Sequence, residues 1–275
     1  MPLRDPQPDP IALKLSAIAI EAGLLLQRME HSIKDHRIKE DGTPTTGADL
    51  AAEKLIIARL GDTFPGVPIV AEETANAVAP EEYFFLVDPL DGTGDYIRGT
   101  GEYSVNIALV KEGRPIAGVI AAPALKRIWI AGDHASEGEI SDSAADEIAW
   151  RPLQSRIAVE GELVALVSRR HGDATTDALL DALSIRTRRT ASSAVKFGLI
   201  AAGEADVYIR CGPTMEWDTA AGDHILTRAG GRVIGPGGTP MTYGHQSRGY
   251  RNGPFAAVGD TRLAQRVLLP ATASA

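Results

Sequence analysis

The strongest constraint on the fold of this chain lies at residues 83–93, where an apolar run stops at an aspartate–proline pair. Residues 83–87 are all apolar, which predicts a short strand that comes from the core. The segment Asp-Pro-Leu-Asp-Gly-Thr at residues 88–93 follows at once, and its proline and glycine favour a tight bend. Asp88 and Asp91 are thereby placed on one turn. Their carboxylate oxygens can converge on a hard cation such as Mg²⁺.

The other polar groups of this turn suit both a cation and an anion. Leu90 can turn its carbonyl toward the same point as the two carboxylates, whereas Gly92 and Thr93 offer backbone N–H groups and a hydroxyl to an anion. The same residue types have a purely local explanation, because Asp, Pro and Gly are common in turns that end a strand. The turn by itself leaves both interpretations open.

A pair of glutamates follows a second predicted strand. Glu72 and Glu73 come directly after the short apolar run at residues 67–71. Paired glutamates are commonly solvated surface residues. If the strand ends at Glu72 and Asp88 are neighbours, however, the negative charge gathered there requires a metal ion or protons.

Two further aspartates lie at predicted helix starts. Asp49 lies in the first turn of a helix expected over about residues 47–60, with Thr46 or a close neighbour as its cap, and Asp218 lies where another helix is expected to begin. Aspartate stabilises such positions through capping and through the helix dipole, so a local explanation exists for each.

Apolar periodicity predicts an α/β (α+β) protein. Residues 11–31 have helical spacing, an antiparallel meander follows in the first half, and strands alternate with helices in the second half. The acidic stretch 134–150 is expected to be a link or a surface excursion. These features predict two packed subdomains, 1–150 and 151–275, each with a sheet covered by helices. The expected meander strands are 104–110, 115–121 and 127–131; the later strands are 163–167, 205–209, 231–234 and 255–258, and the later helices are 173–183, 192–202, 217–229 and 261–267.

Composition limits the classes of function. The 275 residues carry a net charge of −8 with no dominant cluster of Lys and Arg, which argues against binding a nucleic acid polymer. The single cysteine, Cys211, excludes an intrachain disulfide and a cysteine-ligated structural zinc site. Residues 11–26 are the most apolar early stretch, but charged residues interrupt them, so neither a transmembrane segment nor a signal peptide is expected. We expect a cytoplasmic protein that binds a small molecule.

Taken together, the acidic segments resemble the inositol monophosphatase superfamily. The resemblance rests on Glu72-Glu73, on residues 88–93 and on Trp-Asp-Thr-Ala-Ala-Gly at residues 217–222, in this order and spacing. It extends from about residue 13 to residue 259. It implies the layered αβαβα sandwich of sugar phosphatases and inositol monophosphatases, and a lithium-sensitive, Mg²⁺-dependent phosphatase activity.

Two other segments are similar to the CysQ branch of that superfamily. They are Gly-Glu-Tyr-Ser-Val-Asn-Ile-Ala-Leu at residues 101–109 and Cys-Gly-Pro-Thr at residues 211–214. The resemblance implies a 3'(2'),5'-bisphosphate nucleotidase, which removes the 3'-phosphate from adenosine 3',5'-bisphosphate, a by-product of sulfate assimilation, and yields AMP and phosphate. Acceptance of adenosine 3'-phosphate 5'-phosphosulfate stays open, because phosphate and sulfate are close in shape.

The resemblance also implies a set of metal ligands. Glu72, Asp88 and the carbonyl of Leu90 would hold a first Mg²⁺. Asp88, Asp91 and Asp218 would hold a second, and Glu72 would help to hold a weaker third ion. Such ions neutralise a phosphate monoester, lower the pKa of bound water and stabilise the leaving oxygen. Li⁺ would inhibit the reaction.

The remaining roles follow from the same resemblance. Asp49 with Thr93 would polarise the attacking water, and Glu72 would take part in catalysis through the metal. No covalent intermediate is required, so Cys211 is expected to be a small buried side chain rather than a nucleophile. The implied substrate-binding residues are Asp91, Gly92, Thr93, His171, Ser193, Lys196, Arg210 and Asp218.

Arg210 carries the most weight for the choice of substrate. Inositol monophosphatases place an acidic side chain near this strand end, where it contacts substrate hydroxyls, whereas the planar guanidinium of an arginine suits a second phosphate. Local explanations also exist, since His171 fits a loop histidine and Lys196 fits a solvated helix residue. The chain departs from CysQ proteins at residues 94–96, where Gly-Asp-Tyr replaces a basic residue followed by Glu-Phe. The departure bears on fine specificity and not on the metal site.

Other functions are alternatives at this point. A phosphatase of the same superfamily that acts on inositol 1-phosphate or on other sugar phosphates fits the metal residues, although Arg210 and Lys196 argue against it. A non-catalytic regulator that binds phosphate or metal would be expected to have a damaged metal set. A dinucleotide-dependent dehydrogenase is disfavoured, because Ile97 stands where the glycine fingerprint needs a glycine. Members of the superfamily occur as monomers and homodimers, and some associate with the inner membrane face, so both properties stay open.

Overall fold

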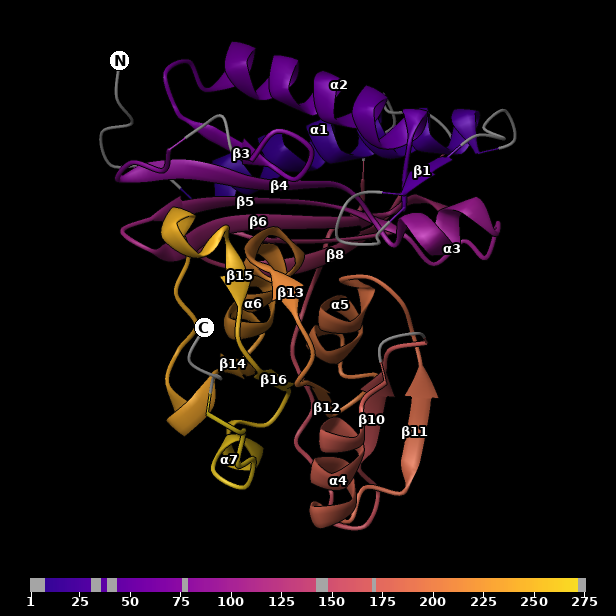
Figure 1. Cartoon of the computed structure of the whole chain (residues 1–275), viewed down its shortest axis with the longest axis vertical. Helices are drawn as coiled ribbons and strands as arrows, with labels where there is room; N and C mark the ends of the chain where they lie inside the picture. The colour runs from indigo at the N-terminus through magenta and orange to yellow at the C-terminus, as the bar shows by residue number, and fades with distance from the viewer. Residues whose placement is uncertain are drawn as a thin grey trace.

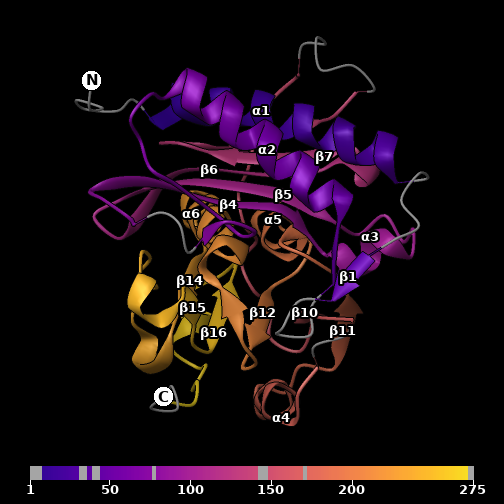
Figure 2. The ribbon, with the colours of Figure 1, turned by 45° about the horizontal axis from the view of Figure 1, so that its top comes forward.

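Two β-sheets alternate with layers of helices (Figure 1). The computed structural model describes residues 8–30, 36–38, 44–75, 79–141, 148–169 and 172–271. Within these ranges the larger sheet has seven strands and the smaller sheet has five. The layers follow the order helix, sheet, helix, sheet, helix (Figures 1 and 2), which confirms the predicted αβαβα sandwich.

The larger sheet contains the predicted meander. Its first two strands are parallel, and each later neighbour is antiparallel to the one before it. In order across the sheet, the strands are β3 (Ile69–Ala71), β4 (Tyr83–Asp91), β5 (Ser104–Lys111), β6 (Arg114–Ala122), β7 (Arg127–Ala131), β8 (Ala135–Glu139) and β9 (Arg151–Pro152).

Burial on both faces explains why β4 is apolar without interruption. Phe84 and Leu86 belong to the hydrophobic core between the two sheets, and Phe85 and Val87 belong to the core on the opposite face. Successive side chains of a strand point to opposite faces, so a strand with a core on each side needs apolar residues at every position. Residues 83–87 are all apolar because the strand is buried on both faces.

Helices form the outer layer above the larger sheet and the layer between the sheets. The long helices α1 (Pro8–Met29) and α2 (Gly47–Thr63) pack on the outer face, against β6 and β4. The inner face contacts α5 (Val195–Ala201) and α6 (Ala220–Arg228), which lie between the two sheets in both views. Thr46 caps α2 through a hydrogen bond from the Ala48 N–H, as predicted.

The smaller sheet lies below this shared helical layer. Its strands, in order across the sheet, are β11 (Thr187–Thr190), β10 (Val164–Val167), β12 (Val207–Arg210), β16 (Phe255–Val258) and β14 (Arg232–Ile234). The first three are parallel, and β16 runs antiparallel to both of its neighbours. Its far face is covered by α4 (Ala174–Ala182) and α7 (Thr261–Ala264) (Figure 1). In the described chain, none of the helices is both long and apolar enough to cross a membrane.

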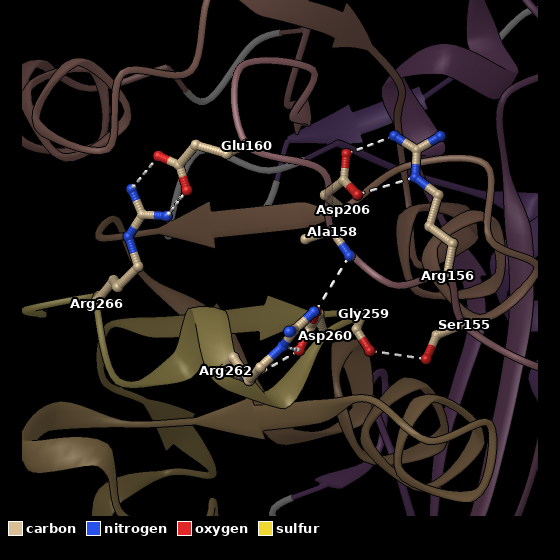
Figure 3. A network of polar contacts seen from close by, with 9 residues as sticks. All are labelled: Ser155, Arg156, Ala158, Glu160, Asp206, Gly259, Asp260, Arg262 and Arg266. Atoms are coloured by element: carbon tan, nitrogen blue, oxygen red, sulfur yellow. Dashed lines mark hydrogen bonds and ion pairs between the residues drawn. The ribbon is translucent and has the colours of Figure 1, made fainter.

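An irregular linker joins the two sheets between β9 and β10. Side chains and backbone groups of residues 155–160 fasten it to residues just before β12 and just after β16, at one end of the smaller sheet, and to Arg266 beyond α7 (Figure 3). The bonds run from Ser155 Oγ to the Gly259 carbonyl (2.7 Å), from Arg156 Nε to Asp206 (2.9 Å), from the Ala158 N–H to Asp260 (3.1 Å) and from Arg266 to Glu160 (3.0 Å). The subdomain boundary between residues 150 and 151 stays a prediction.

Three expectations about local structure were incomplete. Residues 134–150 are not a simple excursion, because β8 pairs along β7 and β9 pairs with β8. Asp218 does not begin a helix; it is the last residue of the 3-10 turn Glu216–Asp218, and α6 starts two residues later. The exposed strand β11 was missed. The remaining short elements are β1 (His36–Ile38), β2 (Pro44–Thr46), α3 (Thr93–Ile97), β13 (Thr214–Met215), β15 (Arg251–Asn252) and the 3-10 turns Pro123–Leu125, Pro236–Gly238 and Gln246–Arg248.

Candidate active site

A cavity of about 680 Å³ is lined by residues of both sheets and of the helical layer between them. It brings together most of the predicted site residues. These are Glu72, Asp88, Leu90, Asp91, Gly92, Thr93, Ser193, Lys196, Arg210 and Asp218. Asp49 lies directly behind Thr93, to which it is hydrogen-bonded. His171 falls outside the described residues.

The end of β4 explains how Asp88 and Asp91 reach one site. The strand continues through Pro89 to Asp91, and its pairing with β5 shifts register between the two aspartates. Proline has no N–H to give to the neighbouring strand, so the ladder is interrupted and the strand bends there. The Leu90 N–H donates a 3.0 Å hydrogen bond to Asp88 Oδ1 and holds that carboxylate at the bend.

The carboxylates of Glu72, Asp88, Asp91 and Asp218 lie close enough to repel one another. Burial raises the pKa of Asp88 well above its usual value, and the charges of Glu72, Asp91 and Asp218 raise it further. Burial, followed by the charge of Asp91, raises the pKa of Asp218 to about 8. Burial also raises the pKa of Asp91, although Lys196 opposes this shift. Like charges this close and this buried need protons or a cation between them.

The donor set fits a hard divalent cation. The groups in question are carboxylate oxygens together with the buried Leu90 carbonyl, and Mg²⁺ prefers oxygen ligands. Among the described residues, no three His, Cys, Asp or Glu side chains are already arranged as a closed set of ligands. The mutual repulsion of the carboxylates, rather than a finished cage, is the observation that indicates cation binding.

Gly92 joins the end of β4 to α3 and occupies a position that excludes other residues. Its φ of 94° lies in the left-handed region, and a Cβ placed there would lie 2.9 Å from the carbonyl oxygen of Glu102. Thr93 follows as the first residue of α3. Its hydroxyl lies 2.9 Å from Asp49 Oδ1 and 3.1 Å from the Leu90 carbonyl oxygen.

Asp49 is fixed by the capping box of α2. Its Oδ2 accepts hydrogen bonds from the backbone N–H (2.8 Å) and the hydroxyl (2.6 Å) of Thr46, which leaves Oδ1 for Thr93. The side chain is buried, and burial raises its pKa against the lowering effect of these hydrogen bonds. Asp49 therefore has both a structural and a candidate functional role. One oxygen of its carboxylate belongs to the capping box of α2, and the other accepts a hydrogen bond from Thr93, which lines the cavity.

Lys196 is a buried cation that organises the loop at residues 191–194. It is 3% exposed, and its Nζ donates to the carbonyls of Ser193 (2.6 Å) and Ala191 (3.3 Å). It also lies 4.8 Å from the centre of the Tyr208 ring. The prediction of a solvated helix residue, offered as the local alternative, is wrong for this lysine.

Glu102 fastens the same loop to the larger sheet, and its position was not predicted to matter. One carboxylate oxygen accepts a 2.6 Å hydrogen bond from Arg169, and the other accepts a 3.0 Å bond from the Ser192 N–H. Both donors line the cavity. The only signal in the sequence is the place of Glu102 in the segment 101–109, which by itself assigns no contact.

Arginines supply the positive charge of the cavity. Arg210 lines the cavity together with Asp91 and Asp218, and its charge lowers the pKa of both carboxyls against the larger effect of burial. Its Nη2 donates to the Pro213 carbonyl, whereas its Nε is buried without a hydrogen-bond partner among the described residues. Arg169 and Arg251 also line the cavity. The short run Arg169-Arg170 fitted a solvated edge in the sequence, and Arg251 belongs to no pattern there, so neither was predicted as a site residue.

A family model, "Inositol monophosphatase family", matches residues 8–269. The chain belongs to this family. It is 37% identical over 213 residues to the 3'(2'),5'-bisphosphate nucleotidase CysQ of Salmonella typhimurium, covering 74% of this chain and 81% of that protein. It is 30% identical over 253 residues to the enzyme of the same name from Haemophilus influenzae, covering 88% and 90%.

Solved structures of the inositol monophosphatase family have the same architecture. CysQ from Bacteroides thetaiotaomicron superimposes with a TM-score of 0.75 at 29% identity, over 90% of this chain and 96% of that one. An inositol monophosphatase from Thermotoga maritima gives the same TM-score of 0.75 at 21% identity, over 92% and 94%. The second likeness, at its lower identity, shows the fold alone.

The segment at residues 94–96 keeps an acid, Asp95, at the edge of this family site, and its departure from the CysQ pattern in charge lies at residue 94. Asp95 lines the cavity and is 5% exposed. Burial opposes its ionisation, but hydrogen bonds from Arg98 and Ser192 lower its pKa below the usual value. Asp95 is thus an ionised acid bound to neighbouring donors. The cation that CysQ proteins usually carry nearby has no counterpart at residue 94, which is glycine.

Cys211 lies outside this inositol monophosphatase site. It does not line the cavity, and burial raises the pKa of its thiol. A raised pKa disfavours the thiolate, which is the nucleophilic form of cysteine. Cys211 is only partly buried, so the expectation of a buried side chain is wrong, whereas the raised pKa argues against a nucleophilic role.

Proposed function

We propose that this chain is a Mg²⁺-dependent phosphomonoesterase that hydrolyses the 3'-phosphate of adenosine 3',5'-bisphosphate to give AMP and phosphate. The observation that carries the proposal is the pairing of crowded carboxylates with the cations Lys196 and Arg210 in one cavity. The names of the CysQ relatives, at 30–37% identity over most of each chain, support the choice of substrate.

The metal ligands are proposed as follows. Glu72, Asp88 and the Leu90 carbonyl hold one Mg²⁺; Asp88, Asp91 and Asp218 hold a second; Glu72 helps to hold a weaker third ion. Bound Mg²⁺ supplies charge neutralisation of the phosphate, a lowered pKa of water and stabilisation of the leaving oxygen. The proposal also includes inhibition by Li⁺.

The chain itself positions the water and the phosphate. Thr93 donates its hydroxyl proton to Asp49, so the threonine oxygen presents its lone pairs toward the cavity as an acceptor for a water proton. Asp49 cannot swing away, because Thr46 holds its other oxygen. We assign Gly92 and the backbone at the start of α3 to the oxygens of the reacting phosphate.

Substrate choice is assigned to the second half of the chain. Ser193, Lys196 and Arg210 are proposed to bind the nucleotide, and His171 is retained as a proposal outside the described residues. Arg210 provides a guanidinium suited to a second phosphate. Acceptance of the phosphosulfate, a monomeric or homodimeric state and a cytoplasmic location stay predictions.

The test is phosphate release from adenosine 3',5'-bisphosphate beside inositol 1-phosphate, with Mg²⁺, with EDTA and with added Li⁺. We expect release from the nucleotide that requires Mg²⁺ and is inhibited by Li⁺. Release mainly from inositol 1-phosphate would retain the metal site and reject the nucleotide assignment. The variant Asp91→Asn is the matched control, and full activity in it would reject the metal-site proposal.

A further inference from the structure

Arg251 is held at a fixed place relative to the turn that carries Asp218. Its strand, β15, pairs with β13 so that Arg251 lies opposite Met215. The side chain of the next residue, Asn252, donates to the Met215 carbonyl (2.9 Å) and to Thr219 Oγ1 (2.8 Å). The Met215 N–H in turn donates to Asp218 Oδ2 (2.9 Å). The backbone under Arg251 is therefore tied to the carboxylate side of the cavity.

Among the described cations that line the cavity, the guanidinium of Arg251 can bind a ligand without first giving up a hydrogen bond or an ion pair. Arg251 is exposed and lines the cavity. Arg169 is bound to Glu102, and Lys196 is bound to two backbone carbonyls. Within the described ranges, the Arg251 guanidinium has neither a hydrogen bond nor an ion pair, although Arg210, which has one, keeps its Nε unpartnered.

The place of Arg251 in the fold separates it from Arg169. Arg169 follows β10, and β10 and β15 lie on opposite sides of β12 in both views (Figures 1 and 2). Arg210 is the last residue of β12. Arg169, Arg210 and Arg251 therefore enter the cavity lining from three different segments, and the segment of Arg251 pairs with β13, just before Asp218.

We propose that Arg251 determines specificity by binding the anionic group of the substrate that is remote from the reacting phosphate, namely the second phosphate of a bisphosphate nucleotide. The inference rests on the proposed function. A phosphate dianion accepts several donors at once, and the planar guanidinium offers two of them in parallel. Arg251 and Arg210 together would enclose this group, and a monophosphate would lack the contact.

The test compares Arg251→Gln with Arg248→Gln, a matched exposed arginine that does not line the cavity. We expect Arg251→Gln to lower kcat/KM for adenosine 3',5'-bisphosphate about tenfold, the loss of one charge-assisted contact. For adenosine 3'-monophosphate, which lacks the remote group, the change should stay below about twofold. Arg248→Gln should leave both values at the wild-type level, and Arg251→Lys should restore part of the loss.

Binding of AMP gives a readout that does not depend on turnover. AMP keeps the 5'-phosphate and lacks the reacting one, so calorimetry without added metal measures nucleotide binding that excludes the reacting phosphate. The Kd of AMP should rise about tenfold in Arg251→Gln. Equal losses on both nucleotides, or an unchanged Kd for AMP, would overturn the role of Arg251. A wild-type enzyme that fails to hydrolyse the bisphosphate would overturn the proposed function, and the AMP titration would still decide the role of Arg251.

Discussion

The hydroxyl of Thr93 lies 2.9 Å from Oδ1 of Asp49, although 44 residues separate them in the chain. This contact joins the first residue of α3 to the capping box of α2. The start of α2, in the outer helical layer, is thereby connected with the turn that follows β4 and lines the cavity. The proposed water-binding pair exists in the structure before any ligand is considered.

Removal of the Thr93 hydroxyl should separate catalysis from folding. Thr93→Val keeps the shape of the side chain and leaves the bonds between Asp49 and Thr46 in place. We expect kcat on the bisphosphate nucleotide to fall at least about a hundredfold, because proton transfer loses its positioned partner. Steady-state kinetics measure the effect, and Thr93→Ser should recover activity. Near-normal kcat in the valine variant would show that the hydroxyl has no part in the reaction.

Thr46→Val is the control for this experiment. It removes the cap of α2 and should lower the free energy of unfolding by about 1 kcal/mol. Because the backbone N–H of residue 46 still donates to Oδ2 of Asp49 and Thr93 keeps its contact with Oδ1, kcat should change much less than in Thr93→Val. Urea unfolding and kinetics on the same samples separate the two effects.

The metal-free protein should lose stability as the pH rises. Burial raises the pKa of Asp218 from 3.8 to about 8, so the folded state binds its proton more tightly than the unfolded state does. The free energy of unfolding therefore falls between these two pKa values, by about 1.4 kcal/mol per pH unit for one such group. In EDTA, from about pH 5 to about pH 7.5, wild type should lose on the order of 3 kcal/mol more than Asp218→Asn.

Mg²⁺ should reverse this loss, because the cation takes the place of the protons. Urea titrations at the higher pH should show stabilisation by Mg²⁺ in wild type and much less in Asp218→Asn. Asp62→Asn, a change at an exposed position of α2, serves as the control and should behave as wild type. A pH dependence that is identical in wild type and Asp218→Asn would contradict the electrostatic description of the site.

Glu102→Gln should weaken substrate binding more than chemistry. The change removes the charged partner of Arg169 and weakens the bond to the Ser192 N–H, which loosens the loop at residues 191–194. We expect KM for the bisphosphate to rise about fivefold with kcat changed less than about twofold. Glu160→Gln breaks a comparable pair with Arg266 in the linker and should have no kinetic effect. A parallel fall in kcat would place Glu102 in the chemical step instead.

A glycine of α6 should tolerate no side chain. A Cβ at Gly222 would lie 2.3 Å from the ring of Phe197, in the layer between the sheets. Gly222→Ala should therefore lower the free energy of unfolding by about 1–3 kcal/mol. Gly61→Ala has open space around it within α2 and should raise the stability by about 0.5–1 kcal/mol. Thermal or urea unfolding gives both values, and a neutral Gly222→Ala would show that Phe197 can move aside.

The fold was predictable where local signals and core packing agree. The apolar run at residues 83–87 reflects cores on both faces of β4, and Thr46 caps α2 as its sequence context indicates. Residues 187–190 are Thr-Arg-Arg-Thr and all four are exposed, so the edge strand β11 has no apolar pattern to reveal it. The strand β8 is hidden for a similar reason, because its residues are small or acidic.

Some residues of the candidate site could likewise be predicted from the sequence, and others could not. Asp88, Asp91 and Glu72 carry a signal because they stand at the ends of predicted strands. Arg251 carries none, and Glu102 has only its place in the segment 101–109, because the contacts of both depend on which distant segments lie beside them. The environment of Lys196 was equally unreadable, since its helix start looks exposed until the sheet and Tyr208 cover it.

The helical layer between the sheets gives the two halves of the chain a common core. Phe84 of the larger sheet and Phe255 of the smaller one belong to the same cluster of buried side chains, with Phe197 of α5 among them. Neither sheet can lose its packing without exposing apolar surface of the other. Inside a cell, a destabilising substitution in either half would present the whole chain to proteases, so that the abundance of the protein changes along with its activity.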